Sequence, residues 1–293
     1  MGSVNEMYDL ILGIAREDER IRAVYMDGSR TNPNVPKDIF QDYDIVYVVT
    51  ETASFLKDEH WIDVFGDLIM IQEPDKLDNG VGKSIDFENS YGYLMLFKDG
   101  NRIDLHIQTK EAIFDEYGKG KLTVPLLDKD NRLPPIPTPT DIDYHVQPPT
   151  EPAFISCTNN FWWCLQNVAK GIWRDELPYA KRMFEEITRS DLDKMVRWWI
   201  GLNHDFEVST GKMGKYFKKY LPASYWELYE RTYSDSHYDN FWDSIFVTCE
   251  LFRTLAKEVA SNFLFSYSTD DDENMTEYLR HVRTLPRDAQ DIY

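Results

Sequence analysis

Apolar and polar residues alternate in two different ways along the chain, and the change falls near its middle. In the first half, short apolar runs are separated by turn residues such as glycine, proline, asparagine and aspartate, a pattern typical of strands. We therefore expect a small mixed sheet in this half. The runs that we interpret as strands are Ile21–Met26, Asp42–Val49, Leu68–Ile71, Gly92–Lys98, Arg102–Ile107 and Leu122–Leu127.

Three helices are predicted beside these strands, and the last is a short one over Glu111–Tyr117. In the segment Val4–Arg20, apolar residues recur at helical spacing with charged residues between them, and Thr52–Asp63 repeats that pattern more briefly. The segment Asp75–Asn89 has no steady period and contains two glycines. We therefore expect a mobile loop over Asp75–Asn89.

From Ala153 onward the apolar residues follow the helical period, which predicts a helical bundle and hence an α+β fold for the whole chain. The acidic stretch Thr269–Glu273 is expected to be a turn that separates the last helix from the rest. The segments that we expect to form helices are 161–172, 183–200, 224–233, 241–263 and 277–283.

The segment Asn131–Pro152 contains seven prolines, counting Pro152 itself. Proline lacks a backbone N–H donor and fixes φ, so such density excludes a helix or a central strand and favours a semi-rigid linker. We therefore place domain boundaries at 1–133, 134–152 and 153–293. A proline-rich ligand for another protein's recognition domain is the alternative, which is disfavoured because the segment lies between two folded halves.

Candidate catalytic and binding residues gather at the ends of the predicted strands. Gly28 and Ser29 end the first strand, so Ser29 and the backbone amides around it can meet an anion. Asp42 and Asp44 alternate with Tyr43, and side chains two residues apart share one face of an extended strand. Two carboxylates on one face repel each other unless a cation neutralises them, and Mg²⁺ is the usual cation beside nucleotide phosphates.

A third carboxylate, Asp104, lies between apolar neighbours on a later strand. An acid in that position is costly unless a metal or a hydrogen-bond donor meets it. Taken singly, a Gly-Ser pair is usually a turn and an Asp-x-Asp pair is usually a solvated edge. The order and strand context of Asp42, Asp44 and Asp104 together favour a metal-dependent centre for phosphoryl or nucleotidyl transfer.

The net charge and the cysteine content indicate which classes of partner and which cellular compartment suit the chain. The chain has 51 acidic and 32 basic residues and a formal net charge of −19, which argues against a nucleic-acid partner and suits a small cationic substrate, although an acidic surface also aids solubility. Three cysteines without metal-ligand spacing suggest buried thiols in a reducing cytoplasm. The sequence predicts no export signal and no membrane span, and we expect a monomer.

Several separated segments resemble one family within the nucleotidyltransferase superfamily, which includes polymerase beta-like enzymes. Gly28–Asn32, Phe40–Ile45, Leu126–Asp130 and Val168–Gly171 look like the aminoglycoside 6-adenylyltransferases, and the resemblance runs nearly end to end. It implies a nucleotidyltransferase-fold domain followed by a helical substrate-binding domain. It also implies Mg²⁺-dependent transfer of an adenylyl group from ATP to a hydroxyl of an aminoglycoside such as streptomycin, which confers antibiotic resistance.

The resemblance implies roles for particular residues. Asp42, Asp44 and Asp104 would be the catalytic metal ligands, with Asp104 the third ligand or the base. The phosphates of ATP would lie on Gly28, Ser29 and Arg30. Basic residues of the helical half, which includes the basic cluster 211–219, would clamp the triphosphate. The residues expected to do so are Lys170, Lys212 and Lys215.

Two further residues are expected to contact the acceptor. Glu88 lies in the predicted loop that would border the substrate cleft. Asn160 stands where the family commonly has an acid before Phe-Trp, and this departure leaves other readings open. The alternatives are a nucleotidyltransferase with a different acceptor (a lincosamide, another aminoglycoside or a protein) and a catalytically weak homologue that binds a small molecule.

Overall fold

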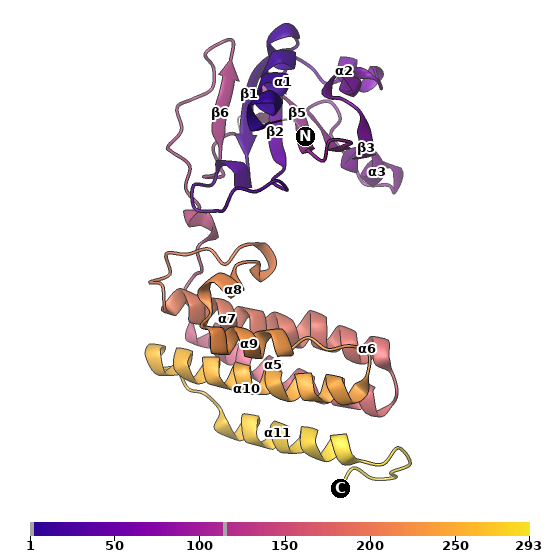
Figure 1. Cartoon of the computed structure of the whole chain (residues 1–293), viewed down its shortest axis with the longest axis vertical. Helices are drawn as coiled ribbons and strands as arrows, with labels where there is room; N and C mark the ends of the chain where they lie inside the picture. Colours follow the sequence, from indigo (N-terminus) through magenta and orange to yellow (C-terminus); the bar gives the residue numbers. More distant parts are fainter. Residues whose placement is uncertain (1–2, 114–115) are drawn as a thin grey trace. The chain divides into compact units, whose positions relative to one another are not determined.

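The structure is a computed structural model that describes residues 3–113 and 116–293. The chain separates into two compact units, one ending at Asp143 and the other spanning Tyr144–Tyr293. The first contains the sheet and the second is helical (Figure 1), so the predicted α+β class is confirmed. The division falls inside the segment 134–152, and the boundaries of that linker stay a prediction.

The first unit is built on one sheet of six strands in the order β3-β4-β5-β2-β1-β6. Strands β2 and β5 are parallel, whereas the other neighbouring pairs are antiparallel, so the predicted mixed sheet is confirmed. The strands are β1 (Ile21–Asp27), β2 (Tyr43–Val49), β3 (Leu68–Gln72), β4 (Ser90–Phe97), β5 (Arg102–Thr109) and β6 (Val124–Asp128).

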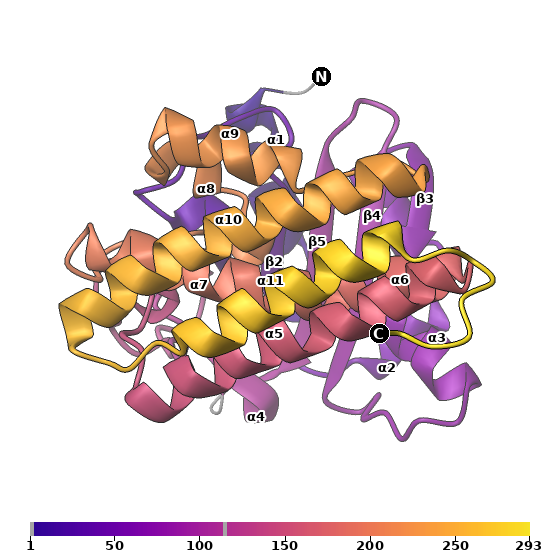
Figure 2. The same cartoon turned by 90° about the horizontal axis from the view of Figure 1, so that it is seen from below.

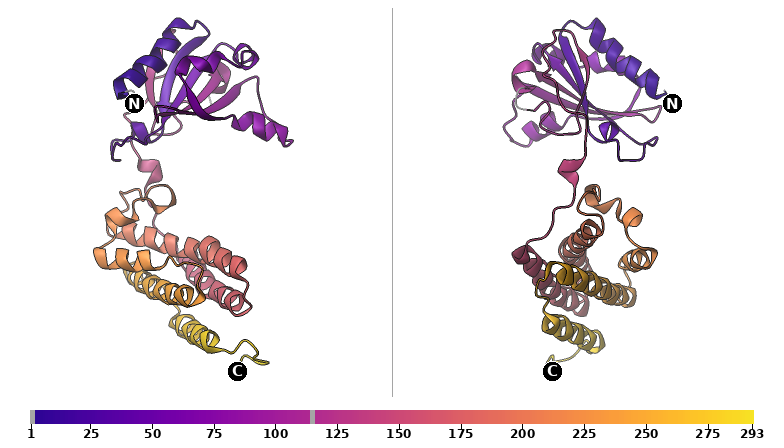
Figure 3. Two further views of the ribbon diagram at one scale, coloured as in Figure 1. Left: turned by 45° about the vertical axis from the view of Figure 1, so that its right-hand side comes forward. Right: turned by 90° about the vertical axis from the view of Figure 1, so that its left-hand side faces the viewer.

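One face of the sheet packs against helix α1 (Val4–Glu17), which lies across it in Figure 3. A capping box at Ser3 and Glu6 begins the helix, and its buried stripe fits the predicted helical spacing. The buried hydroxyl of Tyr47 donates to the carbonyl of Ile11 at 2.6 Å, which ties α1 to β2. The strand that carries Asp44 is therefore anchored from behind.

Alternation along β2 assigns its side chains to two faces. Tyr43, Ile45 and Tyr47 belong to the core beneath α1. Val46 and Val48 belong to a smaller cluster on the other side. Since side chains two residues apart share a face, Asp44 lies on the same side as Val46 and Val48. The carboxylates thus project from the face opposite α1.

Two segments of this unit differ from the sequence predictions. The expected helix over Thr52–Asp63 is divided into α2 (Ala53–Lys57) and the 3₁₀ turn η2 (Trp61–Phe65). The expected loop over Asp75–Asn89 is wrong in its first part, because Pro74–Gly80 forms helix α3. Proline suits the first helical turn, where its missing N–H is not needed, and α3 is too short to show a period.

The second unit is a bundle, as predicted. Helix α11 lies along α5 (Figure 2), and α10 packs on α7. The rings of Phe161 and Phe252 stack at 3.6 Å between centroids, and all three cysteines are buried. Its helices are α5 (Glu151–Trp173), α6 (Leu177–Arg182), α7 (Arg189–Leu202), α8 (Phe217–Tyr220), α9 (Ala223–Arg231), α10 (Tyr238–Phe263) and α11 (Thr269–Thr284), with a π-helical turn η4 (Met183–Thr188) before α7 and a 3₁₀ turn η5 (Lys212–Gly214).

The last helix begins earlier than predicted. The acidic stretch Thr269–Glu273 is the first turn of α11 and not a separate turn, because Ser268 caps the helix and accepts a hydrogen bond from the amide of Asp271. Carboxylates in a first turn interact favourably with the helix dipole. Over residues 3–113 and 116–293, no helix is both long and apolar enough to cross a membrane.

Candidate active site

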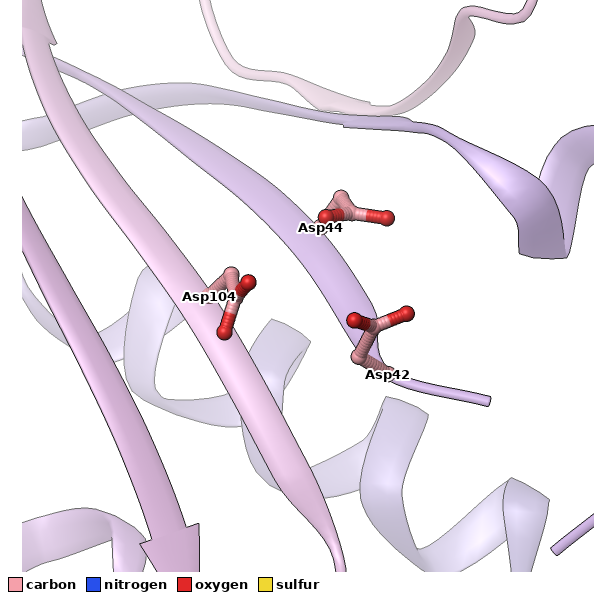
Figure 4. Close-up of side chains that lie close together, drawn as sticks. All are labelled: Asp42, Asp44 and Asp104. Carbon is pink, nitrogen blue, oxygen red and sulfur yellow. The ribbon is translucent and has the colours of Figure 1, made fainter. Parts of the chain in front are cut away.

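Strand register brings acidic residues into one row. Asp44 on β2 is paired with Asp104 on the parallel strand β5, and Asp27 on β1 is paired with Asp44 from the other side. Asp42 directly precedes β2. Figure 4 shows Asp42, Asp44 and Asp104 on two adjacent strands, and one oxygen of each lies within 4.8 Å of the others. The structure therefore brings together the three acids that the sequence singled out.

Gly28 makes room for this arrangement. Its φ of 78° favours glycine, and a Cβ built on it would lie 2.0 Å from Oδ2 of Asp44. The carboxylate of Asp44 thus lies directly against the Gly28 backbone. The 3₁₀ turn η1 (Ser29–Thr31) follows, and the Thr31 hydroxyl fixes it by donating to the carbonyls of Gly28 at 2.9 Å and Leu122 at 2.8 Å.

Arg30, which was expected to meet phosphates, is engaged with backbone in this structure. Its Nη2 donates to the carbonyl of Gln41 at 2.6 Å, and its Nε donates to the carbonyl of Asp42 at 3.2 Å. Its guanidinium also lies 3.7 Å from the centre of the Tyr43 ring. These contacts hold the backbone from which Asp42 projects, so Arg30 braces the first carboxylate.

Arg102 is a site residue that the sequence analysis missed. Its Nε and Nη2 donate to the two oxygens of Asp104 at 2.7 and 2.6 Å, and its guanidinium lies 3.9 Å from Oδ2 of Asp42. The sequence contained a signal for this ion pair, because Arg102 and Asp104 are two residues apart on a strand and so share a face. A cation of the chain itself already compensates part of the acidic cluster.

Asp27 was also missed. It ends β1 directly before Gly28, and the Thr123 hydroxyl donates to its Oδ1. Burial raises the pKa of the Asp27 carboxyl despite that hydrogen bond. Its pairing with Asp44 depends on the β1–β2 register, which local sequence does not reveal. The sequence feature that pointed to Asp27 as a site residue is its position at the end of a strand, directly before the Gly-Ser turn.

Asp44 is the most perturbed carboxyl of the cluster. Burial raises its pKa to about 7, and the negative charges of Asp42, Asp104 and Asp27 act in the same direction, whereas Arg102 opposes them. Desolvation and like charges both disfavour the ionised form. The folded protein therefore stores unfavourable electrostatic energy at Asp44, which a bound cation would relieve.

Glu88 is not brought to these carboxylates. It is exposed and precedes Ser90, which is paired with Gln108, whereas Leu94 on the same strand is paired with Asp104. The separation along the strands from Asp104 to Gln108 is about 13 Å at ~3.3 Å per residue. A contact between Glu88 and the acceptor stays a prediction.

The other expected site residues belong to the helical unit. Lys170 is partly buried near the end of α5, whereas Lys212 and Lys215 are exposed around η5. Asn160 on α5 donates through Nδ2 to Oδ2 of Asp191 at 2.6 Å. An acid therefore lies directly beside Asn160, although position 160 itself is neutral.

The buried side chain of Asp191 has a second partner, Lys194, whose Nζ lies 3.0 Å from Oδ1. The chain thus has a carboxylate beside position 160 that belongs to helix α7 and not to α5. Sequence spacing did not reveal it, because residues 160 and 191 are 31 positions apart.

Comparison with known proteins agrees with the motifs. The model of the family described as streptomycin adenylyltransferase matches residues 1–282. The aminoglycoside 6-adenylyltransferase of Campylobacter jejuni is 40% identical over 97% of each chain, and that of Bacillus subtilis (strain 168) is 38% identical over 96% of this chain and 98% of its own. The sequence matches confirm the predicted resemblance.

One solved structure is also similar. The crystal structure of an aminoglycoside 6-adenyltransferase from Bacillus subtilis has 33% sequence identity and a TM-score of 0.48, covering 97% of this chain and 100% of its own.

Gly28→Ala tests the contact between Gly28 and Asp44. The substitution adds a methyl group where the Asp44 carboxylate lies and strains a positive φ, so we expect a loss of roughly 1–3 kcal/mol in the free energy of unfolding. We also expect loss of Mn²⁺ binding in the presence of α,β-methylene ATP, measured by isothermal titration calorimetry. Gly100→Ala is the control, because Gly100 has a φ of 89° but no atom within 4 Å of the place that its new methyl group would take. Equal Mn²⁺ binding by both variants would contradict the steric role.

The raised pKa of Asp44 predicts a pH dependence of stability. Between about pH 4 and pH 7 the folded protein keeps a proton that the unfolded chain has lost, so the free energy of unfolding falls as pH rises. Asp44→Asn removes this term. In EDTA, urea unfolding should show the variant gaining roughly 2–4 kcal/mol on the wild type from pH 4 to pH 8. A difference that is constant over this range would refute the assignment.

Proposed function

The chain belongs to the streptomycin adenylyltransferase family, and we propose that it transfers an adenylyl group from ATP to a hydroxyl of an aminoglycoside such as streptomycin, thereby conferring resistance. The observation that carries the proposal is the cluster of Asp42, Asp44 and Asp104 on adjacent strands beside the Gly28 turn. Enzymes that move phosphoryl or nucleotidyl groups need such oxygen ligands beside the phosphates. The cytoplasm, where ATP is available, is the proposed compartment.

The donor set suits Mg²⁺. All three groups are carboxylates, their nearest oxygens lie within 4.8 Å of one another, and burial with like charges raises the pKa of Asp44 to about 7. Mg²⁺ prefers oxygen ligands at about 2.0–2.1 Å and is usually held by one or two carboxylates together with substrate phosphates. A bound Mg²⁺ would offset the charge on the phosphates and on the leaving pyrophosphate.

The residues of the chain position the reactants. In the transfer, the acceptor hydroxyl oxygen forms a bond to the α-phosphorus of ATP while the bond to the bridging oxygen of pyrophosphate breaks in line. The proton of the hydroxyl passes to a base, and Asp104 is our candidate for this base or for the third ligand. The Gly28 and Ser29 amides are proposed to receive the phosphates, and Arg30 keeps the backbone of Asp42 in place.

Basic residues of the helical unit are proposed to neutralise the triphosphate. Lys212 and Lys215 are exposed, and the stretch 211–219 gathers four lysines in a strongly acidic chain. Ammonium groups stabilise phosphate charge as point charges without requiring a fixed geometry. Lys170 is proposed for the same role because its neighbours in α5 are small and apolar.

The acceptor is proposed to be cationic. The net charge of −19 favours the approach of a guanidinium or ammonium compound. Asn160, bonded to the carboxylate of Asp191, is the proposed contact on the helical unit. The pair presents an amide whose orientation is fixed by a buried acid, so Asn160 can serve the acceptor without being an acid itself.

Asp44→Asn tests the metal-dependent chemistry. The change keeps the shape of the side chain but removes a ligand charge, so we expect transfer from radiolabelled ATP to streptomycin in the presence of Mg²⁺ to fall by several orders of magnitude. Asp67→Asn is the matched control, because Asp67 is exposed and pairs with Lys98 away from the cluster. Near-wild-type transfer by Asp44→Asn would remove this site from consideration.

Asn160→Ala tests the acceptor contact. We expect KM for streptomycin to rise about tenfold while KM for Mg·ATP changes less than about twofold, because a binding contact to one substrate is lost. Steady-state kinetics of pyrophosphate release measure both constants. Asn159→Ala, at the neighbouring exposed position of α5, is the control. Unchanged streptomycin kinetics in Asn160→Ala would exclude the contact.

A further inference from the structure

Arg102 occupies both oxygens of the carboxylate that the proposed metal site requires. Its Nε and Nη2 donate to Oδ1 and Oδ2 of Asp104 at 2.7 and 2.6 Å in a two-point ion pair. The Asp104 side chain is only 15% exposed, whereas that of Arg102 is 47% exposed. The guanidinium therefore covers the acid from the solvent side.

The same guanidinium reaches the rest of the cluster. It lies 3.9 Å from Oδ2 of Asp42, and its charge opposes the rise in the pKa of Asp44. It is thus a cation of the chain itself that allows three carboxylates to gather before any metal binds. A divalent ion at these carboxylates would be repelled by Arg102 and would compete with it for Asp104.

A triphosphate changes this balance. It brings several negative charges to the same place, and a guanidinium fork pairs with phosphate oxygens as well as with a carboxylate. Asp104 is then released to other partners while Arg102 keeps a counter-charge. Charge compensation is complete only when metal and nucleotide are present together.

We infer that Arg102 couples metal binding to nucleotide binding: it disfavours the metal alone at Asp42, Asp44 and Asp104 and favours the metal together with a nucleoside triphosphate. The inference rests on the proposed function, because it assumes that these carboxylates are the metal ligands. Arg102 acts by pairing with Asp104 when the nucleotide is absent and with the phosphates when it is bound. Coupling of this kind is reciprocal between the two ligands.

A different role for Arg102 predicts the opposite change in the affinity for the metal when Arg102 is removed. If the guanidinium only held Asp104 in the orientation that a metal needs, removing it would weaken metal binding in the absence of nucleotide. If it competes with the metal, removing it tightens that binding. The affinity for the metal alone therefore separates the two roles, and it can be measured without turnover.

The experiment measures Mn²⁺ binding to the full chain by electron paramagnetic resonance, with and without α,β-methylene ATP, which cannot donate its adenylyl group. For Arg102→Gln we expect Mn²⁺ alone to bind about tenfold more tightly than to the wild type, the scale of one removed positive charge at a partly exposed site. We also expect the analogue to tighten Mn²⁺ binding much less than it does in the wild type.

Arg22→Gln is the matched control. Arg22 on β1 forms a similar two-point pair with Asp130, which follows β6, through Nε at 3.0 Å and through Nη2, but it is not in contact with the cluster. Its variant should bind Mn²⁺ as the wild type does. Arg102→Lys keeps the charge without the fork and should leave Mn²⁺ alone weakly bound, within about threefold of wild type.

The outcomes are distinct. Unchanged or weaker binding of Mn²⁺ alone to Arg102→Gln overturns the inference while the metal site stands. If the wild type binds no Mn²⁺ even with the analogue, the proposed metal site and the inference fall together. Should Arg102→Gln not fold, as judged by thermal unfolding, Arg102→Lys decides: tight binding of Mn²⁺ alone to that variant contradicts a role based on charge.

Discussion

The repulsion between carboxylates that share one face of the sheet is the constraint on which the rest of this site depends. Asp44 has Asp27 on one neighbouring strand and Asp104 on the other, with Asp42 two residues away. Holding these groups ionised and close together without compensating charges or hydrogen bonds would cost more free energy than exposing them to water at the surface. The ion pair of Arg102 with Asp104 and the hydroxyl of Thr123 on Asp27 offset part of that cost, and the remainder favours binding of a cation.

Backbone features hold the acids where repulsion would separate them. The parallel pairing of β2 with β5 fixes Asp44 opposite Asp104, and a slip by one residue would turn one of them into the core. Gly28 admits the Asp44 carboxylate to a place that any side chain would fill. Arg30 holds the backbone that precedes β2, and Tyr47 ties β2 itself to α1. Favourable contacts elsewhere in the unit thus offset the electrostatic repulsion within the carboxylate cluster.

Local patterns predicted much of this arrangement. Alternation along one strand was enough to place Asp42 and Asp44 on a common face, and helical spacing was enough to predict the bundle. The contacts that the sequence did not predict join residues that are distant in the chain. The pairing of Asp27 with Asp44 follows from strand register, and that of Asn160 with Asp191 follows from helix packing. Arg30 shows a further limit, since residue type suggested phosphate binding but did not reveal the backbone carbonyls that it meets. Helix α3 was missed because a helix of seven residues is too short to show a period.

We propose that Asp42 and Asp44 hold a divalent ion beside the phosphates of a nucleotide. The most direct test is a crystal structure of the full chain with Mn²⁺ and α,β-methylene ATP, with diffraction recorded on both sides of the manganese absorption edge. Our account predicts an anomalous peak about 2.2 Å from oxygens of both Asp42 and Asp44 and in contact with the phosphates. Bound nucleotide with no manganese peak at either carboxylate would contradict it.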